Sequence, residues 1–166
     1  MFVVENKFTV LINTSKKHYF IKNWNRISKL FKSMQLNIIF EQSRRLIIIS
    51  NQKNCIVPTI LFKGLMFIRL VNRNVPYMQS KKIFNDSHIG TIIKINRKSN
   101  FLLNNFIIRL YKENRAKHMG KLTSCTIIPY GETLSIVGQT MDVIYLVKAL
   151  GNLKLSKPIC QPKKFI

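Results

Sequence analysis

Acidic residues are scarce in this chain of 166 residues, which has 6 Asp and Glu against 28 Lys and Arg. The six acids are far apart in the sequence: Glu5, Glu41, Asp86, Glu113, Glu132 and Asp142. Nucleases and phosphotransferases generally hold metal ions with clustered carboxylates. The chain also has no P-loop, and its three histidines have no carboxylate, serine or cysteine partner at a typical catalytic spacing. An enzyme is therefore the weakest class of function, and we expect neither a cofactor nor a small-molecule substrate.

Cysteines are also few. Cys55, Cys125 and Cys160 are an odd number, lie far apart and belong to no CxxC or Cys/His cluster. This spacing favours neither a zinc site nor a disulfide framework, and it fits a reducing, intracellular compartment. Cys125 precedes an apolar run, so we expect a small buried side chain there.

No long uninterrupted apolar run is present. The most apolar window, residues 56–71, is broken by Pro58, Lys63, Gly64 and Arg69. It predicts a buried helix and not a membrane span. The first seven residues lack the basic-then-apolar order of a secretory signal. We therefore expect no membrane partner.

Basic charge is abundant instead, with a formal net charge of +22 and 46% apolar residues. So large an excess causes self-repulsion in a folded chain unless an anionic partner offsets it. Nucleic acid is the commonest such partner, and an anionic membrane surface is the second. The charges are spread through periodic apolar sequence, which disfavours a disordered basic tail as their explanation.

The first half predicts a strand at 8–12, strands at 36–40 and 46–50 around a polar turn, and a helix at 58–71. A further helix follows Asn13, Thr14 and Ser15, which are residues that cap helices. Its apolar positions recur at three- and four-residue steps: Phe20, Ile21, Trp24, Ile27, Leu30, Phe31 and Met34. Trp24 is mid-stripe, so a core role is favoured over base stacking. Residues 76–84 predict one more short helix.

The second half predicts a strand at 91–95, a basic helical segment at 102–121, a hairpin at 122–138 and a helix at 141–153. Gly131 supplies the conformational freedom for the turn at 130–132. This β–α–α–β–β–α order is that of a KH RNA-binding unit. The polar residues 85–87 suggest a boundary. We therefore predict an α+β chain with three-stranded sheets backed by helices: a degenerate KH-like domain at 1–85 (β–α–β–β–α) for protein docking, a KH domain at 86–155 for RNA binding, and a basic tail at 156–166.

A family resemblance rests on particular residues. These are Phe8, Leu11, Tyr19, Trp24, 92–95, 122–125, 131–135, Gly138 and Pro158. The Leu-Thr-x-Cys and Gly-x-Thr-x-Ser pair is the most specific part. The chain resembles the KRR (Lys-Arg-Arg) motif protein of the small-subunit processome over roughly residues 8–158. The resemblance implies tandem KH-like domains, a nucleolar location, processome protein partners, and a role in pre-18S rRNA processing and 40S assembly. The "partner of Nob" factor, another double-KH protein, fits the β–β–α part less well.

The resemblance also exposes two departures. KH domains hold RNA with a G-x-x-G loop whose bare backbone approaches consecutive phosphates. The family carries Gly-Pro-Lys-Gly there, whereas this chain has Leu110-Tyr111-Lys112-Glu113. The sequence also ends before the family's Lys-Arg-Arg segment. Contact by side-chain charge is then the expected mode of RNA binding. The candidate RNA-binding residues are Arg109, Tyr111, Lys112, Arg115, Lys117 and Lys121.

Each candidate has a plainer interpretation. The basic residues could form a solvated helix face, and Tyr111 could stack on a base or close the helix pair. RNA contact is favoured because almost no acids offset the charge. The remaining function classes are an RNA-binding assembly factor and a basic module that mainly binds proteins, such as a structural ribosomal protein.

Overall fold

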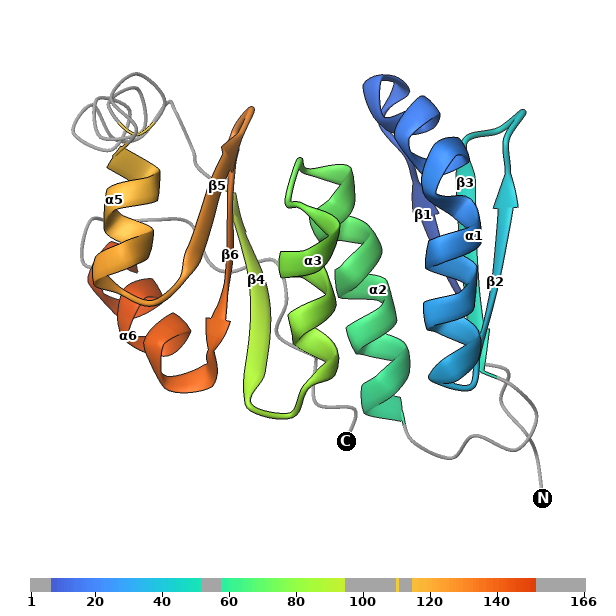
Figure 1. The fold of residues 1–166 in the computed structure, drawn as a ribbon. Coiled ribbons are helices and arrows are strands. Elements are labelled where there is room, and N and C mark those ends of the chain that lie inside the picture. Colours follow the sequence, from blue (N-terminus) through green and yellow to red (C-terminus); the bar gives the residue numbers. More distant parts are fainter. Residues whose placement is uncertain (1–6, 52–57, 95–109, 111–114, 152–166) are drawn as a thin grey trace. The chain divides into compact units, whose positions relative to one another are not determined.

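The computed structural model describes residues 7–51, 58–94, 110 and 115–151 (Figure 1). The chain divides after Asn72 into two compact units: unit 1 is Met1–Asn72 and unit 2 is Arg73–Ile166. Each unit contains one three-stranded antiparallel sheet with helices packed against it. The predicted α+β fold class is confirmed.

Unit 1 has the element order predicted for the first half. The elements are β1 (Lys7–Leu11), η1 (Thr14–Lys16), α1 (Lys17–Ser33), β2 (Leu36–Glu41), β3 (Leu46–Asn51) and α2 (Pro58–Asn72). The strand order in the sheet is β1-β3-β2. Only η1 and α1 lie between β1 and β2, so this unit has no second helix and no glycine-rich loop at that point.

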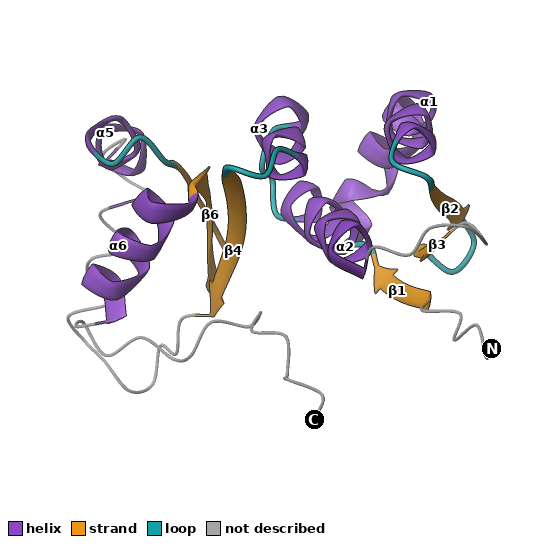
Figure 2. Cartoon of the chain, turned by 90° about the horizontal axis from the view of Figure 1, so that it is seen from below, coloured by secondary structure: helices purple, strands orange, loops and turns teal. Residues whose placement is uncertain are grey.

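Both helices of unit 1 cover one face of its sheet, as Figure 2 shows. That face carries the buried Val10, Ile47 and Ile49, because alternate residues of a strand point the same way. The apolar stripe of α1 packs here, with Phe20, Ile27, Leu30 and Phe31 buried. Fully burying a large apolar side chain stabilises the fold by about 1.5–3 kcal/mol.

Trp24 belongs to this core. Its ring lies 5.3 Å from that of Phe40, and the side chain is half-buried. The structure therefore supports the core role predicted for Trp24. On the opposite face of the sheet no described element of unit 1 packs, and Leu11 and Ile39 are 60% and 58% exposed.

The predicted capping role of Asn13 is wrong. Neither Asn13 before η1 nor Lys16 before α1 makes a side-chain cap hydrogen bond. Asn13 instead pairs with the buried Asn72 at the end of α2: the Asn13 backbone N–H donates to Asn72 Oδ1 at 2.9 Å, and Asn13 Nδ2 donates to the Asn72 carbonyl at 3.2 Å. Asn72 Nδ2 also donates to the Leu11 carbonyl. The asparagine pair fastens the end of α2 to the end of β1.

Unit 2 follows the order predicted for the second half, preceded by a short helical segment. The elements are α3 (Tyr77–Lys81), η2 (Lys82–Phe84), β4 (His88–Lys94), α5 (Arg115–Leu122), β5 (Thr126–Tyr130), β6 (Thr133–Gln139) and α6 (Thr140–Gly151). The strand order is β4-β6-β5. The predicted hairpin is confirmed, with Gly131 in its turn at φ +56°. Except for Leu110, the predicted helical segment before residue 115 lies outside the described residues.

The central strand β6 is buried on both faces. Leu134 and Ile136 join a core with Val143 and Leu146 of α6. Ser135 and Val137 alternate with them and face the other side, where η2 packs against β4 and β6. Figure 2 shows α6 and α3 on opposite sides of these strands. The helical layer formed by α3 and η2 therefore covers the second face of the sheet of unit 2.

The division between the units lies earlier than the boundary predicted at 85–87. The segment 73–87 packs with unit 2, and Thr140 of α6 donates its backbone N–H to the Ser87 carbonyl at 3.0 Å. The predicted basic tail at 156–166 lies outside the described residues. Among the helices of the described ranges, none combines the length and apolar character needed to cross a membrane.

Candidate nucleic-acid interface

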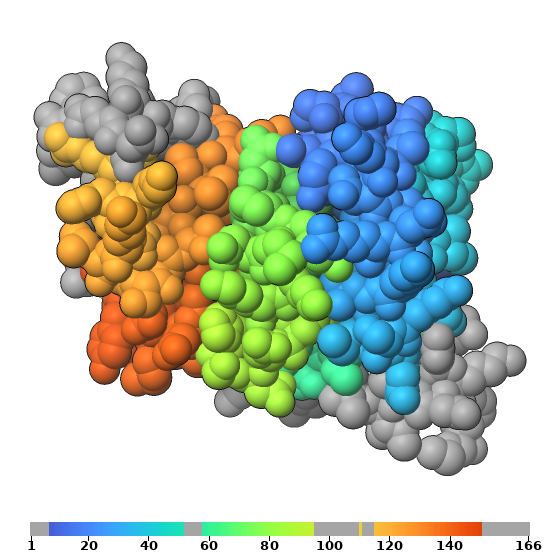
Figure 3. Space-filling view, viewed as in Figure 1, coloured from blue at the N-terminus to red at the C-terminus, as the bar shows by residue number. Residues whose placement is uncertain are grey.

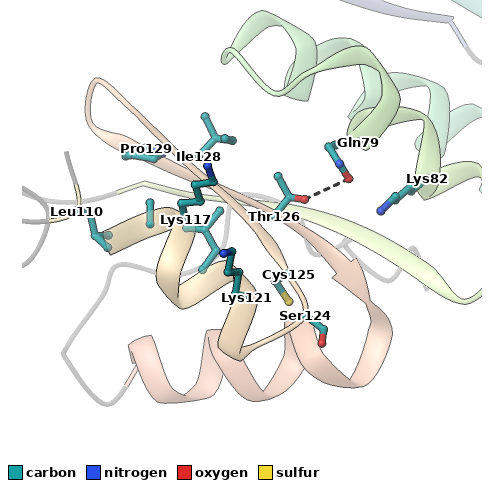
Figure 4. Close-up of a pocket in the computed structure, with 13 residues that line it drawn as sticks. Gln79, Lys82, Leu110, Lys117, Lys121, Ser124, Cys125, Thr126, Ile128 and Pro129 are labelled. Carbon is teal, nitrogen blue, oxygen red and sulfur yellow. Dashed lines mark hydrogen bonds between the residues drawn. The ribbon is translucent and has the colours of Figure 1, made fainter. Parts of the chain in front are cut away.

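A groove with a volume of about 640 Å³ runs along β5 in unit 2. Residues of α5 line one side of it, and Gln79 of α3 and Lys82 of η2 line the other (Figure 4). Figure 3 shows the surface of β5 between the surfaces of α5 and α3. Among the described strands β5 pairs only with β6, so it is an edge strand. One row of its backbone donors and acceptors is therefore not used by the sheet.

Among the described residues that line the groove, the charged side chains are all cations. Lys117 and Lys121 extend from α5 and Lys82 from η2, and all three are exposed. Within the part of the chain that the structure describes, no acidic side chain lines the groove and none of these three lysines has an ion-pair partner. Three uncompensated ammonium groups around one hollow create a positive potential that attracts polyanions.

The groove has an apolar lining between its cations. Ala116 and Ile127 belong to the core of unit 2, and Ile128 and Pro129 are half-buried. Proline is tolerated in β5 because an edge strand does not need every N–H for pairing. Apolar side chains flanked by cations suit a flexible chain that carries flat bases on a charged backbone.

The narrow spacing between α5 and β5 depends on Gly120. A Cβ atom at this position would lie 2.5 Å from the Cys125 carbonyl oxygen, which is closer than real Cβ atoms approach. The Cys125 backbone N–H donates to the Gly120 carbonyl at 3.0 Å, and Ser124 has a φ of +52°. The chain therefore turns back tightly after α5, which places β5 directly beside the helix.

Cys125 contributes packing and not a reactive thiol. It is buried, as predicted, and it is free. Burial raises the pKa of the thiol above its ordinary value, a hydrogen bond with Thr123 acts in the opposite direction, and the negative charge of Asp142 raises the pKa further. The thiol is therefore protonated at neutral pH and is a poor nucleophile.

The structure describes three of the six predicted RNA-binding residues. Arg115, Lys117 and Lys121 all lie on α5 with exposed side chains. Lys117 and Lys121, one turn apart, line the groove, whereas Arg115 does not. Arg109, Tyr111 and Lys112 lie outside the described residues. Their place at the interface stays a prediction.

Leu110 takes the position of the first glycine of the family's loop. Its side chain is 2% exposed and belongs to the core of unit 2. The departure from the G-x-x-G pattern therefore has a structural role, since the leucine packs into the core beneath the groove.

Sequence reasoning missed Gln79 and Lys82. Lys82 is one of two adjacent lysines, and nothing in the sequence distinguishes it from Lys81. Gln79 is an ordinary polar residue of a short helix. Their contribution follows only from the packing of α3 and η2 beside β5. No group of three His, Cys, Asp or Glu side chains in the described ranges is placed to hold a metal ion.

Comparison with known families bears on the first half of the chain. The family model described as "Krr1 KH1 domain" aligns with this chain over one continuous segment. Residues 6–86 match the Krr1 KH1 domain. The resemblance to the KRR-motif family is thereby confirmed over these residues. The Krr1 KH1 match includes all of the described part of unit 1 and continues through α3 and η2, which pack in unit 2.

Solved structures resemble nearly the whole chain. Dim2p from Pyrococcus horikoshii is 16% identical with a TM-score of 0.72, covering 89% of this chain and 90% of that protein. A protein of unknown function from Aeropyrum pernix is 14% identical with a TM-score of 0.75, covering 91% and 83%. A chain of the a/eIF2alpha–aDim2p–rRNA complex from P. horikoshii is 16% identical with a TM-score of 0.73, covering 94% and 89%. At these identities the likeness establishes the fold, so the predicted tandem KH-like architecture is confirmed.

Proposed function

We propose that the chain binds single-stranded RNA through the groove of unit 2 and acts as a factor in ribosomal RNA processing. One observation carries the proposal: Lys82, Lys117 and Lys121 surround an apolar groove on an edge strand, and no acid is among the described residues that line it. Lysines bind phosphates as point charges, and apolar surfaces accept the faces of unpaired bases.

Two comparisons support this proposal. The first half matches a Krr1 KH1 domain, and KH modules recognise single-stranded RNA. One structural neighbour is a chain of the a/eIF2alpha–aDim2p–rRNA complex. The Krr1 match favours the KRR-motif family over the "partner of Nob" factor. With that family we propose action in the small-subunit processome on the pre-18S region, in 40S biogenesis, within the nucleolus.

We further propose that unit 1 docks protein partners in that particle. Its single helix between the first two strands leaves no loop in which backbone could cradle phosphates. The face of its sheet that carries Leu11 and Ile39 exposes these two large apolar side chains beside polar ones. Large exposed apolar side chains gathered on one face are typical of protein–protein contacts.

The test reverses charge at the groove. The variant Lys117→Glu/Lys121→Glu should bind a fluorescein-labelled single-stranded fragment of small-subunit rRNA at least about tenfold more weakly than the parent, since two attractions become two repulsions. Fluorescence anisotropy on the full chain measures the affinity, and circular dichroism checks the fold. Both residues are exposed, so the fold should persist.

The matched control is Lys22→Glu/Lys29→Glu, which makes the same charge change on exposed positions of α1. It should weaken binding much less. The dependence of log affinity on log salt should flatten only in the groove variant, by about 0.7 for each phosphate that the variant no longer neutralises. Equal reductions in affinity for the two variants would mean diffuse attraction to the whole basic surface and would overturn the groove as the RNA site.

A further inference from the structure

The groove has a second wall that does not belong to the β–α–α–β–β–α set. That set begins with β4 at His88, whereas Gln79 and Lys82 precede it in α3 and η2. By sequence, these two residues fall within the Krr1 KH1 match, which ends at residue 86. By packing, they belong to unit 2 and line its groove. The first-domain sequence therefore supplies part of the second domain's candidate site.

Gln79 is held in a defined orientation. Thr126 of β5 donates its hydroxyl to Gln79 Oε1 at 3.2 Å, and both side chains are half-buried (Figure 4). The described residues offer the Gln79 carboxamide no other hydrogen-bond partner. One lone pair of the oxygen is thus used, and the NH2 group keeps two donors for a ligand.

Lys82 lies about one helical turn after Gln79, on the same side of β5. Its exposed ammonium has no ion-pair partner among the described residues. A directional amide donor beside an unpaired cation is a combination that suits a nucleotide, whose base edge accepts hydrogen bonds and whose phosphate is anionic. Neither group would serve an apolar protein segment.

We propose that Gln79 and Lys82 form a nucleotide subsite on the α3/η2 side of β5, in which the Gln79 amide recognises a base edge and Lys82 contacts the phosphate. The subsite rests on the proposed RNA-binding function. With Oε1 engaged by Thr126, the amide presents donors, so it favours a base with a carbonyl at C6 of a purine or C4 of a pyrimidine, which is guanine or uracil. Adenine and cytosine present an amino donor at that position and are disfavoured.

The first experiment measures base preference with the full chain. A randomised pool of single-stranded RNA octamers is incubated with protein, and the bound fraction is sequenced. The parent should enrich guanine and uracil at one position by roughly two- to tenfold, the range expected for one hydrogen bond. Gln79→Glu keeps an oxygen for Thr126 but presents only acceptors to the base. It should shift the preference towards adenine and cytosine.

Two further variants and one control separate recognition of the base from the orientation of the amide and from the phosphate contact. Thr126→Val removes the hydroxyl that orients the Gln79 amide, and valine is favoured in strands. It should reduce the base preference without reversing it. Lys82→Glu should weaken binding evenly across the pool, whereas Lys81→Glu makes the same change at an exposed neighbour outside the groove and should have a much smaller effect.

The outcomes distinguish the two proposals. If the parent shows no base preference, or if Gln79→Glu leaves the preference unchanged, the base-recognition subsite is overturned even where Lys117→Glu/Lys121→Glu still weakens binding. If Lys82→Glu and Lys81→Glu behave alike, the phosphate contact is overturned. If reversing the charges of Lys117 and Lys121 leaves RNA affinity unchanged, the groove is not the RNA site and the proposed function fails. Circular dichroism checks in each case that the variant is folded.

Discussion

Leu110, at the position of the first glycine of the G-x-x-G loop, has a packing role and not a phosphate-binding one. A glycine at the start of a KH loop permits close approach of the backbone to phosphate. Here the leucine side chain is almost fully buried among Ile93, Ala116 and Ile127. Returning this position to a small residue would therefore remove core packing before it could improve a phosphate contact.

Replacing Leu110 by alanine should lower the free energy of unfolding by about 2–5 kcal/mol, because a buried leucine leaves a cavity that the core fills only in part. Chemical denaturation followed by circular dichroism measures the change. The matched control is Leu122→Ala, where the leucine is 74% exposed, and it should change stability by less than about 0.5 kcal/mol. Similar destabilisation of the two variants would contradict the buried placement of Leu110.

The helix α5 and the strand β5 act as one structural element of the groove. Their spacing is set by Gly120, by the hydrogen bond from the Cys125 backbone N–H to the Gly120 carbonyl, and by the left-handed backbone at Ser124. Two groove lysines project from this helix, while the apolar lining comes largely from this strand. The tight turn between α5 and β5 therefore sets the distance between the lysine ammonium groups and the apolar lining.

Replacing Gly120 by alanine should force α5 away from β5. The gain in helix propensity, about 1 kcal/mol, is opposed by a clash with a backbone carbonyl, and overpacking of this kind costs about 1–3 kcal/mol. We expect lower stability together with weaker RNA binding, measured by denaturation and by anisotropy well below the unfolding transition.

Gly131→Ala is the control for this change. It has open space around its Cβ position but a left-handed backbone, so it should destabilise the hairpin turn by about 1–2 kcal/mol. Because this turn does not set the position of α5, RNA affinity should be retained. Retention of full affinity by Gly120→Ala would show that the helix–strand spacing does not shape the site.

The whole chain carries a net charge of +22. A folded protein with such an excess is stabilised by an anionic partner that neutralises it. A processing factor and a structural ribosomal protein would both meet this requirement, and they differ in whether the protein remains with its RNA. The match to a Krr1 KH1 domain favours the processing factor.

In sucrose gradients of cell extracts, the chain should sediment with precursor particles that contain unprocessed small-subunit rRNA and should be absent from mature subunits. Crosslinking followed by sequencing of the bound RNA should recover pre-rRNA. A core ribosomal protein probed in the same gradient gives the opposite pattern and serves as the control. Stoichiometric recovery of the chain on mature subunits would favour the structural ribosomal role instead.

Local pattern was sufficient for the element order. Short apolar runs on either side of a polar or glycine-containing turn predicted both hairpins, and the stripe of α1 followed from helical periodicity. These features are local, because a strand or helix buries the face that its own sequence makes apolar. Lys117 and Lys121 could be placed on an exposed helix face for the same reason.

The groove itself required packing between distant segments. Gln79 and Thr126, which are hydrogen-bonded, are 47 residues apart, and Asn13 and Asn72 are 59 apart. No short-range pattern distinguishes such partners from other polar residues. Leu110, likewise, could be recognised as a core residue only once the helices and the sheet of unit 2 were packed together. Local sequence determines which face of each element is apolar, whereas the partner of a polar group depends on how those faces meet, because a hydrogen bond requires two atoms at a defined distance.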